Sequence, residues 1–442
     1  MNISESEIIV KGRFLRKVAN KIPKYAKFLV MFLLFLCVPL TEARAEEILT
    51  WEDCVKEAKK NHPDLLSAKE KLNQTKANKA ITKSNLLPQI SSSVSGRTSK
   101  TAAENRTDSY SYGITGKQTL FDGFKTFSDV AAASKNIESA QYNYQVTSSD
   151  VRLRLRTAFV ELLKAQELLN ITEDIATRRK QNVELVRLRY EVGREHKGSL
   201  LTAQANLAQA EFEVAQARRN IDLAQRRLTK ELGRKEMTPV GAKGDFEIKY
   251  SYQEKPDFEL LSQNTPFMQG LIAKKEAARF GSKSAKANLF PQVSANASAG
   301  GSASHWPPDR NEWSVGVGLS LPLFEGGSRI AEISRANALF KQAEVDERSG
   351  RDSVLLTLED TWIGLQDAID RIKVQQKFVE ATEERAKIAQ AQYSTGLISF
   401  DNWTIIEDDL VRTKKSFLDV QANALIAEAN WIQATGGMLD EE

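Results

Sequence analysis

Few side chains in this 442-residue sequence have the types and spacing that chemistry requires. The histidines at 62, 196 and 305 are scattered, and no pair of them has the close spacing of metal ligands. No residue set resembles a nucleophile with its base, and the phosphate-binding pattern GxxxxGK followed by Ser or Thr does not occur. We therefore expect no enzyme, no cofactor and no metal. Function must then come from how the structural elements are arranged.

The N-terminus has the layout of a secretion signal. A basic stretch precedes an apolar run at 28–40, and small residues follow at Ala43 and Ala45. This order predicts a signal peptide at 1–45. The alternative is an N-terminal membrane anchor, which needs about 20 apolar residues. Cys37 follows a leucine, where lipid attachment requires a small residue, so we expect no acylation there.

Without that segment the chain is nearly neutral, with 54 basic and 55 acidic residues. The positive charge of the whole sequence thus belongs to the leader, and nothing indicates binding to nucleic acid. Cys54 is the one cysteine that remains, so no internal disulfide is expected in the exported chain. Its helical context predicts a small buried side chain.

The rest of the sequence is a tandem repeat with a constant offset of 203 residues. Five landmarks recur at that spacing: 61–63 with 264–266, 85–90 with 288–293, 120–123 with 323–326, 190–193 with 393–396, and 231–233 with 434–436. This indicates a duplicated domain, since solenoid repeats have periods of about 20–50 residues. We predict a first unit at 46–233, a linker at 234–256, a second unit at 257–436 and a tail at 437–442.

Each unit is predicted to contain a helix, two strands, a long helix and a shorter helix. The first helix spans 50–86, with Thr50 as a candidate N-cap, and the long helices span 124–192 and 327–395. Apolar residues recur every seven positions in the long helices, which predicts coiled-coil seams. The seam residues are Leu155, Leu162, Leu169, Ala176, Val183 and Tyr190, and at the same offset Leu358, Leu365, Ile372, Val379, Ala386 and Tyr393.

The strands alternate between polar and apolar residues. The apolar side of the second strand in each unit carries Tyr110, Tyr112, Ile114 and Leu120, or Trp313, Val315, Val317, Leu319, Leu321 and Leu323. This alternation suits a water-filled membrane barrel, and a soluble sheet with one buried face is the alternative. Four strands cannot form a membrane barrel alone, because lipid cannot satisfy the backbone of two open edges. The barrel interpretation therefore requires several copies.

The paired motifs resemble those of the TolC-type outer-membrane efflux protein family, over essentially all of 48–436. They are Pro-Gln at Pro88 and Pro291, Leu-Phe-Asp/Glu-Gly at 120–123 and 323–326, and Tyr-x-x-Gly at 190–193 and 393–396. The resemblance implies a mainly α fold with a membrane β-barrel. Long helices would form a coiled-coil tunnel, and four strands per chain would close a twelve-stranded barrel as a homotrimer in the outer membrane, in contact with its lipid.

The same resemblance implies a passive duct of an efflux or type I secretion system, gated at its periplasmic tip. Its partners would be a periplasmic adaptor and an inner-membrane pump or ABC exporter. The turns that would form the tip and contact the adaptor carry Gly193, Gly396, Leu397 and Ile398. Asp401 and Asp408 are candidates for the acidic ring that family members place in the pore, with solvated outer-face charges as the alternative. Asn402 and Ile405 occupy positions where some members have aspartate.

Four aromatic residues are candidates for a belt at the membrane boundary, or for packing between copies: Tyr110, Tyr112, Trp306 and Trp313. A periplasmic adaptor or a coiled-coil scaffold without a pore is the alternative function. An adaptor would need a single hairpin between lipoyl-like β segments, whereas this sequence predicts two hairpins and amphipathic strands. The cargo stays open between drugs, metal ions and secreted proteins, because the pump selects what a passive duct carries.

Overall fold

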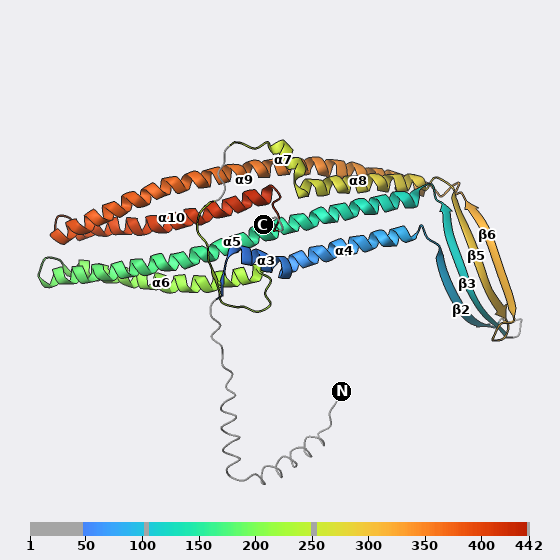
Figure 1. Ribbon diagram of the computed structural model, residues 1–442, viewed down its shortest axis with the longest axis horizontal. Coiled ribbons are helices and arrows are strands. Elements are labelled where there is room, and N and C mark those ends of the chain that lie inside the picture. Colours follow the sequence, from blue (N-terminus) through green and yellow to red (C-terminus); the bar gives the residue numbers. More distant parts are fainter. Residues whose placement is uncertain (1–46, 101–105, 249–253, 440–442) are drawn as a thin grey trace, which may run out of the picture. The chain divides into compact units, whose positions relative to one another are not determined.

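The computed structural model describes residues 47–100, 106–248 and 254–439. The predicted signal peptide at 1–45 lies outside the described residues, as do the end of the predicted tail and part of the predicted linker. From Ile48 onward the chain forms one compact unit. In this unit the helices run side by side, and the four long strands lie at one end of them (Figure 1).

The two repeats contain the same series of elements. The first consists of β1 (Glu47–Leu49), α3 (Trp51–Asn61), α4 (Pro63–Ser84), β2 (Gln89–Ser99), β3 (Thr107–Phe121), α5 (Lys125–Glu191) and α6 (Lys197–Glu231). The second consists of β4 (Val240–Ala242), α7 (Phe258–Asn264), α8 (Pro266–Ala287), β5 (Gln292–Ala303), β6 (Arg310–Ser320), α9 (Ser328–Thr395) and α10 (Phe400–Ala434). The long helices lie where the sequence predicts them, and the shorter helices and strand pairs follow in the predicted order. The predicted strand positions of Leu321 and Leu323 are wrong, because β6 ends at Ser320 and Pro322 has no N–H to donate to a strand partner.

The first helix of each repeat is divided in two, so the prediction of one helix over 50–86 is wrong. Thr50 is the N-cap of α3 as predicted, and it forms a capping box with Asp53. The helix then ends at Asn61, because Pro63 has no N–H to donate and begins the next helix instead. In the second repeat Pro266 begins α8 in the same way. The Asn-x-Pro landmark therefore marks a helix boundary.

Backbone conformation confirms the offset of 203 residues. In the described part of the chain, the residues with positive φ outside any helix or strand fall into four pairs at that spacing: Gly123 with Gly326, Phe124 with Gly327, Gly193 with Gly396, and Gly233 with Gly436. A left-handed residue at each of these turns sets the direction in which the next helix leaves. Both repeats thus turn at the same places.

The four long strands form one antiparallel sheet in the order β2-β3-β5-β6. At the centre of the sheet, β3 of the first repeat pairs with β5 of the second, with Ile114 opposite Ala299. A bulge between Thr119 and Phe121 places Phe121 opposite Val293. The alternation predicts Leu120 on the apolar side. The bulge leaves Leu120 without a partner on β5 and puts Phe121 in the paired position, so the side of Leu120 stays a prediction.

The coiled-coil seams are confirmed in the middle of the long helices. Leu155 and Leu162 of α5 are fully buried, as are Leu358 and Leu365 of α9. On α6 the buried positions also recur every seven residues, and they are alanines: Ala203, Ala210, Ala217 and Ala224. Such small side chains allow the backbones of two helices to approach closely.

The predicted linker contains a short strand. β4 pairs with β1, and the Gln166 side chain of α5 bonds to both the N–H and the C=O of Ala242. The adjoining core includes Cys54, which is completely buried as predicted. Burial raises the pKa of this thiol to about 12. In the described residues, no helix is both long and apolar enough to span a membrane.

Candidate functional site

Two helical hairpins end in glycine turns. The turn between α5 and α6 contains Gly193 at φ 72°, and the turn between α9 and α10 contains Gly396 at φ 83°. The Gly396 N–H donates to the C=O of Tyr393, and the Leu397 N–H donates to the C=O of Gln392. These bonds close the last turn of α9, and they need a left-handed residue at Gly396. The backbone conformation of this turn therefore requires glycine, whether or not another protein binds there.

The four predicted tip residues differ in exposure. Gly193 and Gly396 are exposed, and the Leu397 side chain is 75% exposed. Ile398 instead packs against a cluster that includes Tyr393 and Trp403. Leu397 is thus placed to meet another molecule, whereas Ile398 helps to hold the turn together. Their predicted contact with an adaptor stays a prediction.

Hydrogen bonds join the two hairpins beside these turns. The Tyr393 hydroxyl of α9 donates to Glu195 Oε2, in the turn before α6, at 2.9 Å. Arg189 of α5 donates to the C=O of Tyr393 at 2.9 Å and to that of Ser394 at 3.2 Å. The Tyr393 ring stacks on Trp403 of α10, with 4.3 Å between ring centroids. Burial and the neighbouring Glu195 carboxylate raise the pKa of Tyr393, so it stays a neutral donor. We call Arg189, Glu195 and Tyr393 the tip latch.

The carboxylates after Gly396 occupy different environments. Asp401 is exposed in the first turn of α10, whereas Asp408 forms an ion pair with Arg179 of α5. Glu407, between them, is buried, with Oε1 at 3.4 Å from Arg178 Nη1. The Arg179 guanidinium offsets the charge of Asp408, whereas the Asp401 carboxylate is exposed to solvent. Both residues remain candidates for a pore ring.

The sequence analysis does not predict the ion pairs between α5 and α10. Arg178 and Arg179 meet Glu407 and Asp408, and Lys164 Nζ lies 2.7 Å from Asp419 Oδ1. The bases are on the long helix of the first repeat and the acids on the short helix of the second. A signal exists in the opposite charges of these segments, but the pairing becomes visible only once the helices are known to be neighbours.

The two faces of the sheet differ completely in chemistry. One face carries hydroxyl pairs across neighbouring strands, Ser91 with Thr115 and Ser298 with Ser314, each 2.8 Å apart. The opposite face is apolar and uncovered. Its side chains are between 69% and 79% exposed at Ile90, Val94, Trp313, Val315, Val317 and Leu319. The alternative of a soluble sheet with one buried face does not fit a single chain, since among the described residues none covers the apolar side chains.

The four predicted belt residues gather near the strand ends farthest from the helices. Tyr110 and Trp306 are in edge contact, with 6.5 Å between ring centroids. The Tyr112 hydroxyl donates to Asn311 Oδ1 at 2.8 Å, and Trp313 projects from the apolar face of β6, the edge strand that pairs with β5. A common level on the sheet is what a belt requires, and the belt itself stays a prediction.

Comparison with known proteins identifies the family. The family described as "Outer membrane efflux protein" matches this chain twice, at residues 54–234 and at 258–437, once for each repeat. The chain belongs to the outer membrane efflux protein family. Its relatives include the outer membrane efflux protein BepC of Brucella suis, 24% identical over 91% of this chain and 88% of BepC. The alkaline protease secretion protein AprF of Pseudomonas aeruginosa is 24% identical over 54% of this chain and 51% of AprF.

A solved structure has the same fold as this outer membrane efflux protein. The CmeC outer membrane channel of Campylobacter jejuni superposes with a TM-score of 0.78 at 18% identity, over 88% of this chain and 86% of CmeC. The protein is located in the outer membrane and has a large helical extension into the periplasm. These relatives are channel and efflux proteins, so family membership favours a channel over an adaptor or a scaffold.

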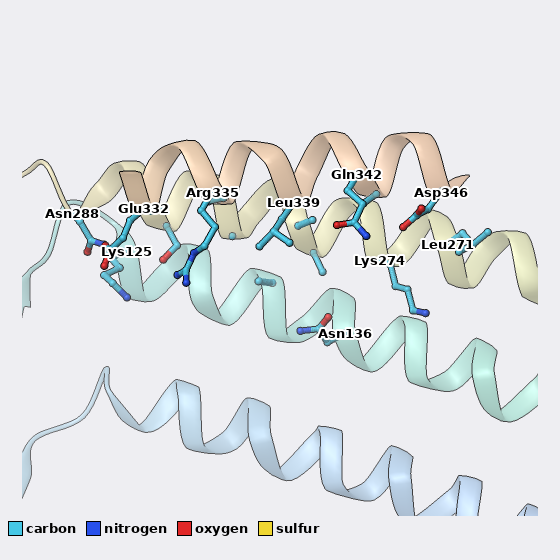
Figure 2. Close-up of a pocket in the computed structure, with 18 residues that line it drawn as sticks. Lys125, Asn136, Leu271, Lys274, Asn288, Glu332, Arg335, Leu339, Gln342 and Asp346 are labelled. Carbon is cyan, nitrogen blue, oxygen red and sulfur yellow. The ribbon is translucent and has the colours of Figure 1, made fainter. Parts of the chain in front are cut away.

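In this efflux protein a groove of about 830 Å³ follows α8 between α5 and α9 (Figure 2). Its rim carries both charge signs, with Lys274 and Arg335 opposed by Glu332 and Asp346. Its floor consists of small residues of α8: Ala277, Ala278, Gly281 and Ala285. Mixed charge over a small-residue floor gives no defined chemistry, and we assign no ligand to it.

Proposed function

We propose that three copies of this chain close a shared twelve-stranded barrel and a helical tunnel, forming a passive duct from the periplasm to the exterior. The duct is the outer-membrane component of a tripartite efflux or type I secretion system. Its partners are a periplasmic adaptor and an inner-membrane pump or ABC exporter. The number three comes from the family resemblance, and the need for more than one copy comes from the sheet.

The sheet is the observation that carries the proposal. In the described residues its order ends at β2 on one side and at β6 on the other, so both edges are open in a single chain. Unpaired backbone groups in lipid cost several kcal/mol each, and barrels of one chain begin at about eight strands. Joining β6 of one copy to β2 of the next removes both edges. The uncovered apolar face then meets lipid, and the hydroxyl face lines the water-filled interior.

The hairpin turns support gating at the opposite end. β2, β3, β5 and β6 connect to one end of the helices, and the glycine turns close the other (Figure 1). The tip latch holds the two hairpins of one chain together there. We infer that the latch favours a closed tip, and that an adaptor bound around Leu397 and the neighbouring glycines releases it. The cargo stays open, since relatives are named for efflux and for protease secretion.

Envelope fractionation tests the proposal. We expect the chain in the outer-membrane fraction, released by detergent, and migrating as a trimer on an unheated SDS gel and as a monomer after heating. Deletion of the gene should abolish export by the pump whose gene lies beside it. A soluble monomer, or a chain that never reaches the outer membrane, contradicts the proposal.

A further inference from the structure

The contact between α5 and α10 shows how a long helix and a short helix of different repeats pack. Val160 of α5 is fully buried against Ala422 and Leu425 of α10. One turn along α5, Lys164 reaches Asp419 at 2.7 Å. This contact joins the two repeats within one chain. Because the repeats match residue for residue, it is also a template for how α9 would meet α6 of a second copy.

The faces that correspond to this contact are uncovered at the other boundary. The equivalent of Val160 is Ile363 of α9, which is 50% exposed, whereas Val160 is 0% exposed. The equivalents of Ala422 and Leu425 are Arg219 and Asp222 of α6, both exposed. A buried face in one repeat is thus open in the other, and on α6 it is charged.

The charges of the two open faces are opposite. The α9 segment 352–370 holds five acidic residues and no basic one, and the α6 segment 216–230 holds five basic residues and one acidic. By the repeat register these segments lie at the same level as α5 149–167 and α10 419–433. Asp360 and Asp367 stand about one turn on either side of Ile363, on the same face of α9.

Some of the α6 bases are already used within the chain. Arg218 lies 2.8 Å from Glu173, and Arg227 lies 2.7 Å from Glu161, both on α5. By contrast, Arg219 and Arg226 are exposed and have no ion pair in the described part of the single chain. Asp360 and Asp367 of α9 are likewise exposed and unpaired there. Two bases and two acids are therefore left for a contact outside the chain.

We propose that the acidic α9 segment 352–370 of one copy docks on the basic α6 segment 216–230 of a second copy. In this contact Arg219 of one copy lies against Ile363 of the other, between Asp360 and Asp367. The proposal rests on the proposed trimer and names the residues that select the neighbour.

The polarity of this surface explains why the ring closes with the correct neighbours. Within the chain the long helix α5 is basic where it meets acidic α10, whereas at the boundary between copies the long helix α9 is acidic and α6 is basic. Placing α6 of a second copy against α5 would oppose bases to bases. Placing α10 of a second copy against α9 would oppose acids to acids. Like charges reject both wrong arrangements.

Charge reversal tests the docking surface on the full-length protein. One variant combines Arg219→Glu with Arg226→Glu, a second combines Asp360→Lys with Asp367→Lys, and a third carries all four substitutions. In about 0.05 M salt, where screening is weak, each two-residue variant should form trimers about tenfold more slowly than wild type. The four-residue variant should recover. The control Arg219→Lys with Asp367→Glu keeps both charges and should assemble normally.

A cysteine pair tests the geometry without relying on charge. Ile363→Cys with Arg219→Cys should give disulfide-linked dimers and trimers on oxidation, because the equivalent Val160 and Ala422 are in contact. Ile363→Cys with Arg218→Cys should not, because Arg218 points to α5 of its own chain. Native Cys54 is buried and does not interfere.

The outcomes separate this inference from the proposed function. Wild-type assembly rates in both two-residue variants, or no recovery in the four-residue variant, overturn the docking surface while leaving the trimeric duct standing. Cross-linking of Ile363→Cys to a different protein in place of a second copy overturns it as well. A wild-type chain that stays monomeric in detergent contradicts both the docking surface and the trimeric duct.

Discussion

A buried carboxylate connects the end of α6 to His62, which lies at the break between α3 and α4. We call this contact the joint. Glu231, at the end of α6, is 7% exposed, and its Oε2 lies 3.3 Å from His62 Nε2. His62 Nδ1 accepts the N–H of Asp64 as the cap of α4, so Nε2 carries the proton and donates it to Glu231. Lys230 lies 2.9 Å from the same carboxylate, and Arg154 lies 3.7 Å from it.

The pKa of Glu231 sets the size of this contribution to stability. The hydrogen bond from His62 and the nearby Lys230 and Arg154 charges outweigh burial, and they lower the pKa from 4.5 to about 2. One pKa unit is about 1.4 kcal/mol, so the joint contributes about 3 kcal/mol to folding. Because the folded pKa is the lower one, this stability is fully present above pH 4.5. It is lost as the pH falls toward 2.

Glu231→Gln tests this value. The amide still accepts the bond from His62 but loses the attraction of the two cations, so we expect a loss of about 2–3 kcal/mol at pH 7. Thermal unfolding in detergent at one scan rate, followed by circular dichroism, should show a lower midpoint than wild type. The gap should close as the pH is lowered to 2.

The matched control is Glu211→Gln, an exposed acid on the same helix, which should leave the midpoint unchanged. If Glu231→Gln has the same unfolding midpoint as wild type at pH 7, the carboxylate does not stabilise the joint. A gap of equal size at pH 2 and pH 7 would show that its effect is not the charge.

Three further substitutions probe the tip and the sheet. Gly396→Pro cannot reach the native φ of 83°, so export should stop while trimers persist on unheated gels, and unchanged export would remove the tip assignment. Tyr393→Phe loses the 2.9 Å bond to Glu195 but keeps the stack on Trp403, so the outer membrane should admit more of a bulky hydrophilic dye, with Tyr190→Phe as the control; equal dye entry would argue against the latch. Val317→Arg on the apolar face should cost about 2–4 kcal/mol in lipid and lower the outer-membrane level, whereas Ser314→Arg on the hydroxyl face should be tolerated; equal levels of the two would refute the assignment of the faces.

The sequence predicts the helices and strands well, because the spacing of apolar residues and the positions of glycine and proline are local properties. Heptads fix Leu155 and Leu358 in their seams, and glycine marks the turns at Gly193 and Gly396. The errors are local too. The break at Pro63 and the end of β6 at Ser320, just before Pro322, interrupt patterns that otherwise continue. Each error falls where one residue alters the backbone without altering the apolar pattern around it.

Contacts between helices are what the sequence alone does not reveal. The pair of Arg178 with the buried Glu407 joins residues 229 positions apart, and neither segment's sequence indicates that the two helices are neighbours. The tip latch is hidden for a similar reason: Tyr190 and Tyr393 occupy the same motif, yet Tyr190 is 39% exposed and Tyr393 is buried. Family resemblance supplies the motif, and only the packing shows which copy of it is used.

The duplicated chain therefore places assembly and gating in different parts of its length. The equivalents of Arg189 and Glu195 in the second repeat are Gln392 and Ile398, so the latch cannot form a second time, at the boundary between copies. The proposed contact between copies is centred on Ile363, about 45 Å along α9 from Tyr393.

This separation predicts that the two functions can be lost independently. Tyr393→Phe should raise dye entry without changing the trimer fraction, and reversing Arg219 and Arg226 should slow assembly without changing dye entry through the trimers that do form. Both readouts on both variants check this. Trimers that dissociate in Tyr393→Phe would mean that the latch holds the copies together as well as the hairpins, and the division between assembly and gating would then be wrong.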